Sequence, residues 1–254
     1  MKKIYFIGTA GSGKSTMVHA FKEWMDLAGA DSVVLNLDPG ADAVPYHADV
    51  DIREWVQLDQ IMDEYGLGPN GAQIAAADLM ALNAEEMASV LADFKSDYLI
   101  VDTPGQMELF AFRASSNVIV DTLGRDGSMF VFLSDPSLSR APNGFVSNMM
   151  LCALVQFRFS LPVLNVLSKA DTLAEEEVDR IREWSMDPMA LYGDLLDEDV
   201  NTQTVMGLEL FKALENVGVY QELRPVSSVE SFGMEDIYAM SELIFRGGED
   251  LQDD

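Results

Sequence analysis

Cysteine, histidine and basic side chains are all scarce in this chain of 254 residues. The single cysteine, Cys152, cannot form a disulfide within the chain, so nothing in the sequence requires an oxidising compartment. His19 and His47 lie far from each other and from any cysteine pattern, which argues against a zinc site and against Cys–His catalysis. No apolar run approaches the roughly 18 residues of a membrane span, and the run before Gly8 is too short for a signal peptide. We therefore expect a cytoplasmic protein that makes no membrane contact.

Acidic residues far outnumber basic ones, with 43 against 16 and a formal net charge of −27. The field of such a protein repels phosphate backbones and anionic lipids, so we expect no direct nucleic-acid binding. The acidity is explained by a solvated surface that keeps the protein soluble, or by adaptation to high salt. The sequence leaves both explanations open.

Short runs rich in β-branched and aromatic residues alternate with segments whose apolar residues are spaced three and four apart. The runs occupy residues 4–7, 32–37, 97–101, 128–133, 162–167 and 223–227. Such runs are typical of buried parallel strands, and strand alternating with helix indicates an α/β fold. We expect a doubly wound, mostly parallel sheet flanked by helices. It would form one domain over 1–246, with a helical insertion at about 187–218 and an acidic flexible tail at 247–254.

Two helical segments carry more specific predictions. Asn83 with Glu86 three residues later predicts a capping box that opens a helix running to about Phe94. The segment 145–159 is apolar around most of its circumference as a helix, so it must be buried on two sides. It is either a central core helix or, as we favour, a helix shared between the sheet and a subunit interface.

Residues 8–15, Gly-Thr-Ala-Gly-Ser-Gly-Lys-Ser, match the phosphate-loop pattern G-x-x-x-x-G-K-[ST] between a predicted strand and a predicted helix at 16–27. Glycines let consecutive N–H groups point inward, and the helix N-terminus adds partial positive charge. Lys14 would reach the outer phosphates, and the Ser15 hydroxyl would ligate Mg²⁺. The nucleotide-binding residues expected here are Gly11, Ser12, Gly13, Lys14, Ser15 and Thr16.

Two carboxylates follow predicted strands and point to the same crevice. Asp102 opens the turn Asp-Thr-Pro-Gly-Gln at 102–106, where it can hold magnesium through water. Gly105 in this turn can place its amide against a third phosphate, so nucleotide state can move the loop. Asp38, in Asn-Leu-Asp-Pro-Gly at 36–40, is either a second such carboxylate or simply a turn residue before proline.

A base-recognition segment follows the strand at 162–167. Ser168-Lys169-Ala170-Asp171 approximates the N-K-x-D signature, with serine in place of asparagine. An aspartate at this position can accept from both N1–H and the exocyclic amine of guanine, which selects GTP over ATP. Ser227, at the end of the last predicted strand, is placed to offer a backbone amide to the guanine oxygen.

The order of these motifs resembles that of the GPN-loop GTPases, a dimeric branch of the P-loop GTPases. Gly-Pro-Asn-Gly at 68–71 carries the resemblance, although alone it would be only a turn. It occurs in order with the motifs at 8–15, 36–40, 102–108 and 168–171, and the resemblance spans about 3–233. It implies the P-loop NTPase fold.

The resemblance also implies an obligate homodimer in which Asn70 of one subunit completes the other subunit's site. Gln106 and Glu108 would orient the attacking water, and Asp38 and Asp102 would serve the magnesium shell with Ser15. No arginine finger is obvious. The candidates Arg53, Arg113 and Arg140 are each more simply salt-bridge partners in so acidic a protein.

The predicted function is a Mg²⁺-dependent GTPase that hydrolyses GTP to GDP and phosphate and uses the cycle to change dimer conformation. By resemblance, an assembly or chaperone-like role with a protein client such as RNA polymerase follows. One alternative is a P-loop kinase with a small acceptor, although no arginine-rich lid is visible. A second is a slow nucleotide-gated binding module.

Overall fold

The computed structural model describes residues 1–198, 202–218 and 222–247. Its centre is a seven-stranded sheet in the order β3-β2-β4-β1-β5-β6-β7, and every paired neighbour runs parallel. The strands are β1 (Lys2–Gly8), β2 (Ser32–Asn36), β3 (Val50–Asp51), β4 (Tyr98–Asp102), β5 (Ser128–Ser134), β6 (Val163–Leu167) and β7 (Arg224–Pro225). The predicted doubly wound α/β fold is confirmed.

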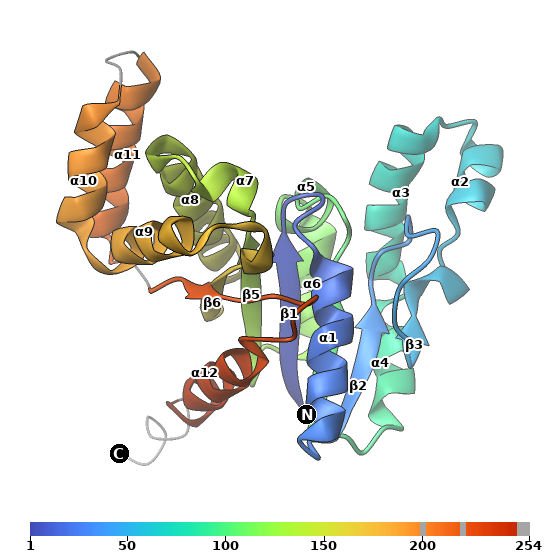
Figure 1. The fold of residues 1–254 in the computed structure, drawn as a ribbon. Helices are drawn as coiled ribbons and strands as arrows, with labels where there is room; N and C mark the ends of the chain where they lie inside the picture. Colours follow the sequence, from blue (N-terminus) through green and yellow to red (C-terminus); the bar gives the residue numbers. More distant parts are fainter. Residues whose placement is uncertain (199–201, 219–221, 248–254) are drawn as a thin grey trace, which may run out of the picture.

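Helices connect the strands and cover both faces of the sheet. They are α1 (Lys14–Leu27), α2 (Leu58–Tyr65), α3 (Pro69–Leu82), α4 (Ala84–Ala92), α5 (Glu108–Ala111), α6 (Ala114–Leu123), α7 (Pro136–Ser139), α8 (Pro142–Phe159), α9 (Glu175–Met186), α10 (Pro188–Asp197), α11 (Thr202–Asn216) and α12 (Met234–Gly247). Two 3-10 helices, η1 (Ile52–Glu54) and η2 (Ala170–Thr172), join them. Figure 1 shows α2 and α3 on the side of the molecule where β2 and β3 lie, and α10 and α11 on the side where β6 lies.

Successive residues of the central strand β1 feed two separate cores because side chains alternate across a strand. Ile4 and Phe6 pack with α1 and α12 on one face, whereas Tyr5 and Ile7 pack with α3 to α6 and α8 on the other. All four are fully buried. At up to roughly 3 kcal/mol for each large apolar side chain, this burial holds the strand that leads into the 8–15 motif.

The helix predicted at 145–159 is α8, and it is buried on two sides as expected. One side of α8 packs in the core that contains Tyr5 and Ile7, through Cys152, Val155 and Phe159. Phe145 and Met149 belong to a third core that α9, α10 and α11 complete. The second side of α8 is covered by helices of the same chain, and the part of this helix in a subunit interface stays a prediction. Helices α10 and α11 lie within the stretch 187–218, where the helical insertion stays a prediction, and residues 199–201 lie outside the described residues.

The capping box predicted at Asn83 is wrong. Asn83 stands between α3 and α4, and its side-chain amide donates to the carbonyl of Leu79 at 2.9 Å in the preceding helix. No side-chain cap bond forms at the start of α4. Gly68 precedes α3 and Pro69 begins it, so the 68–71 motif opens a helix rather than forming a free turn.

Three smaller features differ from expectation or add to it. The last predicted strand, at 223–227, shortens to the two residues of β7, and β3 was not foreseen. Most of the predicted tail, residues 248–254, lies outside the described residues. Within the part of the chain that is described, no helix has both the length and the apolar character needed to cross a membrane.

Candidate functional site

The loop at 8–15 joins the carboxyl end of β1 to α1, and sterics explain its glycines. A Cβ on Gly8 would lie 2.7 Å from Ser12 Oγ and 2.8 Å from the Leu133 carbonyl oxygen, so only glycine fits there. Gly13 precedes α1 with a φ of 93°, in the left-handed region that favours glycine. The backbone thus wraps tightly before the helix begins, as the motif predicts.

Lys14 ties this loop to the turn after β4. Its Nζ donates to the carbonyl oxygens of Gly8 at 3.0 Å, Thr9 at 3.0 Å and Gly105 at 2.8 Å. Burial lowers the pKa of Lys14, and the nearby carboxylates of Asp102, Asp38 and Glu108 act in the opposite direction. A buried cation therefore lies between the two loops that the sequence assigned to phosphate binding.

The parallel register brings Asp102 to the same place. On β4, Asp102 pairs with Phe6 of β1, two residues before the loop begins. Its side chain is fully buried, and burial raises the pKa of Asp102 to about 6, although hydrogen bonds from Ser15 and Tyr46 and the charge of Lys14 lower it. A carboxylate, a hydroxyl and an ammonium thus share one crevice at the carboxyl edge of the sheet, as in doubly wound folds that bind ligands.

Asp38 lies across the crevice and holds two backbone amides. Its Oδ1 accepts from the N–H of Gly40 at 2.9 Å, and its Oδ2 accepts from the N–H of Gly105 at 2.8 Å. Its own N–H donates to Asn36 Oδ1 at 2.9 Å. Asp38 is thus a turn residue that also bridges to the Gly105 turn, and its role toward magnesium stays a prediction.

The segment at 168–171 reaches the same loop from the other side of β1. The N–H of Ser168 donates to the carbonyl of Ser134 on β5 at 3.0 Å, and β6 pairs with β5. Lys169 adopts a left-handed conformation with a φ of 50°, and its Nζ donates to the carbonyl of Gly11 and to Asp135 Oδ2, the latter at 3.1 Å. The base segment and the phosphate loop are therefore in direct contact.

Asp171 and Ser227 lie at the ends of adjacent strands. Asp171 is in η2, directly after β6, and is half-buried. The N–H of Ala170 donates to the carbonyl of Val226 at 3.1 Å, which joins the two segments. The Ser227 hydroxyl accepts from the N–H groups of Val229 and Glu230, which shapes the loop that follows.

The remaining predicted residues lie at the rim. Asn70, in the first turn of α3, is exposed, as are Gln106 and Glu108 beside the phosphate loop. The arginines suggested as fingers all form ion pairs within the chain: Arg53 with Asp51, Arg113 with Asp78 and Arg140 with Glu177.

One residue at this site was missed by sequence reasoning. The hydroxyl of Tyr46 donates to Asp102 Oδ2 at 2.7 Å, and no motif spacing connects the two residues.

The residues present fit a nucleotide and a magnesium ion. Ser12 Oγ and Asp102 Oδ1 are buried and have no hydrogen-bond partner among the described residues, which is unusual for native polar groups. A hydroxyl and backbone amides suit phosphate oxygens, and a carboxylate beside a serine hydroxyl suits Mg²⁺. The donors and acceptors left unpaired in this crevice are of the types that such ligands satisfy.

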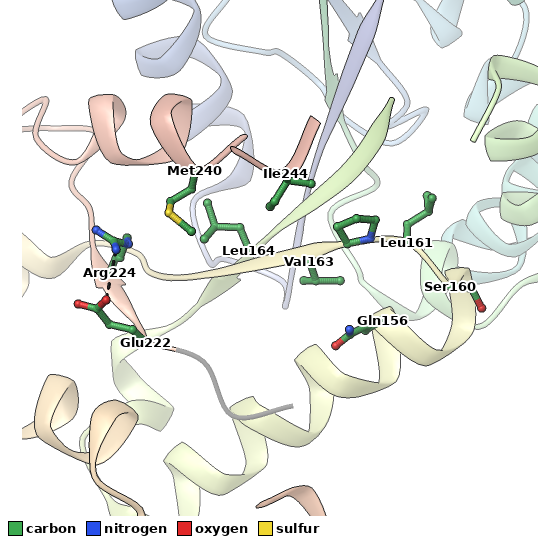
Figure 2. Close-up of a pocket in the computed structure, with 10 residues that line it drawn as sticks. Gln156, Ser160, Leu161, Val163, Leu164, Glu222, Arg224, Met240 and Ile244 are labelled. Atoms are coloured by element: carbon green, nitrogen blue, oxygen red, sulfur yellow. Dashed lines mark hydrogen bonds and ion pairs between the residues drawn. The ribbon is translucent and has the colours of Figure 1, made fainter. Parts of the chain in front are cut away.

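A cavity of about 660 Å³ elsewhere in the chain is not part of this site (Figure 2). Pro162, Val163 and Leu164, at the amino-terminal end of β6, line it together with Met240 and Ile244 of α12. It therefore opens at the edge of the sheet opposite the phosphate loop.

Comparison with known proteins agrees with this geometry. A family model described as "conserved hypothetical ATP binding protein" matches residues 6–246. The chain is 34% identical over 186 residues to the GPN-loop GTPase PAB0955 of Pyrococcus abyssi, covering 72% of this chain and 73% of that protein. The chain belongs to the GPN-loop GTPases.

Two further matches bear on this family assignment. The crystal structure of the Pyrococcus abyssi GTPase in its apo form superposes with a TM-score of 0.86 at 29% identity, covering 96% of this chain and 97% of that one. GPN-loop GTPase 3 of Dictyostelium discoideum is 35% identical over 169 residues, which is 66% of this chain. This chain spans only 59% of the length of that Dictyostelium relative. The Pyrococcus abyssi GTPase thus has the fold described above.

Proposed function

We propose that this GPN-loop GTPase hydrolyses GTP to GDP and phosphate in a Mg²⁺-dependent reaction carried out by a homodimer in the cytoplasm. One observation carries the proposal. Buried Lys14 contacts both the phosphate loop and the Gly105 turn, and buried Asp102 lies beside it with one oxygen unpaired. This is the arrangement needed to bind a phosphate chain at one end and to respond to its last phosphate at the other.

Ser15, Asp102 and Asp38 would hold the magnesium ion. When bound, the ion neutralises charge on the phosphate oxygens and polarises them. Lys14 adds the only lysine charge of the loop. In a protein of net charge −27, these local groups overcome the long-range repulsion of a triphosphate.

Asn70 would act in the partner's site. It is exposed at the start of α3, so its amide is free to contact another subunit. The arginines weighed as fingers are paired within the chain, which supports a role for the Asn70 amide of a second subunit in completing the site. Gln106 and Glu108 are exposed beside the Gly105 turn, where they would orient the attacking water.

Guanine selection would depend on Asp171. Its position after β6, beside the segment that contains Ser227, suits a base held between these two loops. The family model's description names ATP, whereas the related proteins are named GTPases. The aspartate favours guanine because adenine offers no matching pair of donors.

The proposed cellular role is nucleotide-driven conformational switching that assists assembly of a protein client, such as an RNA polymerase. The switch would consist of the Gly105 turn, which contacts Lys14 and Asp38. Loss of the third phosphate would change the contacts of this turn and so the geometry of the dimer.

Phosphate release by the purified chain tests the proposal. We expect release from GTP with Mg²⁺, at least tenfold less from ATP, and none above background when EDTA removes the metal. Small phosphate acceptors should not change the rate. Equal release from ATP, or transfer to an acceptor, would contradict GTP hydrolysis, and a monomer at micromolar concentration in sedimentation would contradict the homodimer.

A further inference from the structure

Tyr46 lies in the loop between β2 and β3 and reaches the buried carboxylate at the end of β4. Its hydroxyl donates to Asp102 Oδ2 at 2.7 Å, across 56 residues of sequence. Only 9% of Tyr46 is exposed, and its ring packs in the core between the sheet and α1. The ring therefore holds the hydroxyl in place, and the hydroxyl holds one oxygen of the carboxylate.

The two oxygens of Asp102 have different surroundings. Oδ2 accepts from Tyr46, whereas Oδ1 is buried with no hydrogen-bond partner among the described residues. The Ser15 hydroxyl, another of the predicted magnesium ligands, also interacts with this carboxylate. A carboxylate with one oxygen fixed and the other left unpaired is oriented to meet a cation.

The loop that carries Tyr46 is itself anchored at several points. Arg53 donates through Nη1 to the carbonyl of Ala41 at 2.8 Å and through Nε to Asp51 Oδ1 at 2.9 Å. Asp49 Oδ2 accepts from the N–H of Val34 on β2 at 2.8 Å. These contacts limit the positions that the loop can adopt, so they also limit where the Tyr46 hydroxyl lies relative to Asp102.

We propose that Tyr46 is a positioning residue for magnesium, acting through Asp102. This inference rests on the proposed function. Tyr46 does not touch the metal. It fixes the rotation of the carboxylate about its Cβ–Cγ bond, so that the unpaired oxygen faces the Ser15 side. Without the Tyr46 hydroxyl, Asp102 loses the hydrogen bond that holds Oδ2 and becomes free to turn, which lowers metal affinity.

Manganese titration followed by electron paramagnetic resonance tests this role, with Mn²⁺ in place of Mg²⁺ and the full chain saturated with GDP. Outer-shell partners of ligands typically change metal affinity by about 10- to 100-fold, so Tyr46→Phe should raise the Mn²⁺ dissociation constant by at least about tenfold. GDP affinity measured in EDTA should stay within about twofold of the original, because the phosphate loop is unchanged.

Tyr5→Phe is the matched control. Tyr5 is also fully buried and its hydroxyl has no hydrogen-bond partner among the described residues, but its side chain lies in the opposite core. The Tyr5→Phe variant should bind Mn²⁺ with the affinity of the original protein. A steady-state measurement supports the assignment if Tyr46→Phe raises the Mg²⁺ concentration for half-maximal turnover while kcat recovers at saturating Mg²⁺.

The outcomes distinguish failure of the Tyr46 positioning role from failure of the proposed Mg²⁺-dependent function. Unchanged Mn²⁺ affinity in Tyr46→Phe would overturn the positioning role, and so would a fall in kcat that saturating Mg²⁺ does not restore. If the original protein with GDP takes up no Mn²⁺ at all, both this inference and the proposed Mg²⁺-dependent function fail.

Discussion

The carboxylate of Asp38 accepts a hydrogen bond from the Gly105 N–H, with 2.8 Å between Oδ2 and the nitrogen. The carbonyl of the same Gly105 accepts from Lys14 at 2.8 Å. The turn after β4 is thus held on one side by an anion and on the other by a cation. If a terminal phosphate binds the Gly105 N–H as proposed, it would compete with Asp38 and so link nucleotide state to the loop after β2.

Removal of the Asp38 carboxylate should destabilise the protein. Asp38→Ala leaves the N–H groups of Gly40 and Gly105 without this acceptor, and bonds to charged groups contribute about 1.5–3 kcal/mol. We expect urea unfolding to show a loss of about 2 kcal/mol in the free energy of unfolding. Asp42→Ala, at an exposed acid of the same loop, should change it by less than about 0.5 kcal/mol. Equal effects of both variants would contradict the bridge.

Lys14→Ala should abolish nucleotide binding. Its ammonium is the buried cation of the phosphate loop, and losing a charge-assisted contact to phosphate should weaken GDP binding at least about 100-fold, or roughly 2.7 kcal/mol. Fluorescence titration with a labelled GDP measures this. Lys22→Ala, on the same helix and paired with Asp26, is the control and should bind normally. Near-normal GDP affinity in Lys14→Ala would refute the site assignment.

Asp171→Asn should relax the preference for guanine. An amide replaces one acceptor with a donor, which mismatches the paired donors of guanine and favours xanthine, so GTP affinity should fall at least about tenfold. Competition between GTP and XTP for the purified variants measures the change. Asp179→Asn, at an exposed position on α9, should keep the original selectivity. If Asp171→Asn also keeps the original selectivity, Asp171 does not recognise the guanine base.

Mixing two inactive variants tests action in trans. In a heterodimer of Asn70→Ala and Lys14→Ala, one site combines an intact phosphate loop with an intact Asn70 from the partner. Random exchange at equal concentrations should therefore restore roughly a quarter of the original phosphate release per site. Each variant alone should stay near background. No recovery after subunit exchange would show that Asn70 does not complete the partner's site.

The pH dependence of stability should report on Asp102. Burial raises the pKa of Asp102 to about 6. At pH values between its ordinary pKa and about 6, the folded state therefore keeps a proton on this carboxyl that the unfolded state has already lost. The contribution to stability is therefore present at low pH and is lost as pH rises through about 6. Without metal or nucleotide, Asp102→Asn should be about 2 kcal/mol more stable than the original protein at pH 7.5, and close to it at pH 4.

Urea unfolding at both pH values, without metal, measures this difference. Asp63→Asn, at an exposed acid on α2, is the control and should have no pH-dependent effect above about 0.5 kcal/mol. A stabilisation by Asp102→Asn that is the same at pH 4 and pH 7.5 would mean that the burial of charge is not its cause.

Local sequence patterns predicted most of the strands and helices. They failed where contacts with residues outside the pattern determined the local structure. The runs at 4–7 and 128–133 are continuous apolar strands, and both lie in the sheet with nearly the expected bounds. The β3 strand has only two residues, too few for any periodicity. Asn83 has the residue type of a helix cap, but α3 continues to Leu82 and its last turn takes the Asn83 amide.

The sequence by itself determined the phosphate loop, because glycine spacing, one lysine and a serine at fixed offsets are enough to form a nest of amides at a helix start. It also determined the α/β order of elements. Only the tertiary structure decided that Tyr46 supports Asp102 and that Asp38 holds Gly105, contacts that span 56 and 67 residues. Such pairs depend on the parallel register that brings strand ends to one edge, and no local pattern records which loops meet there.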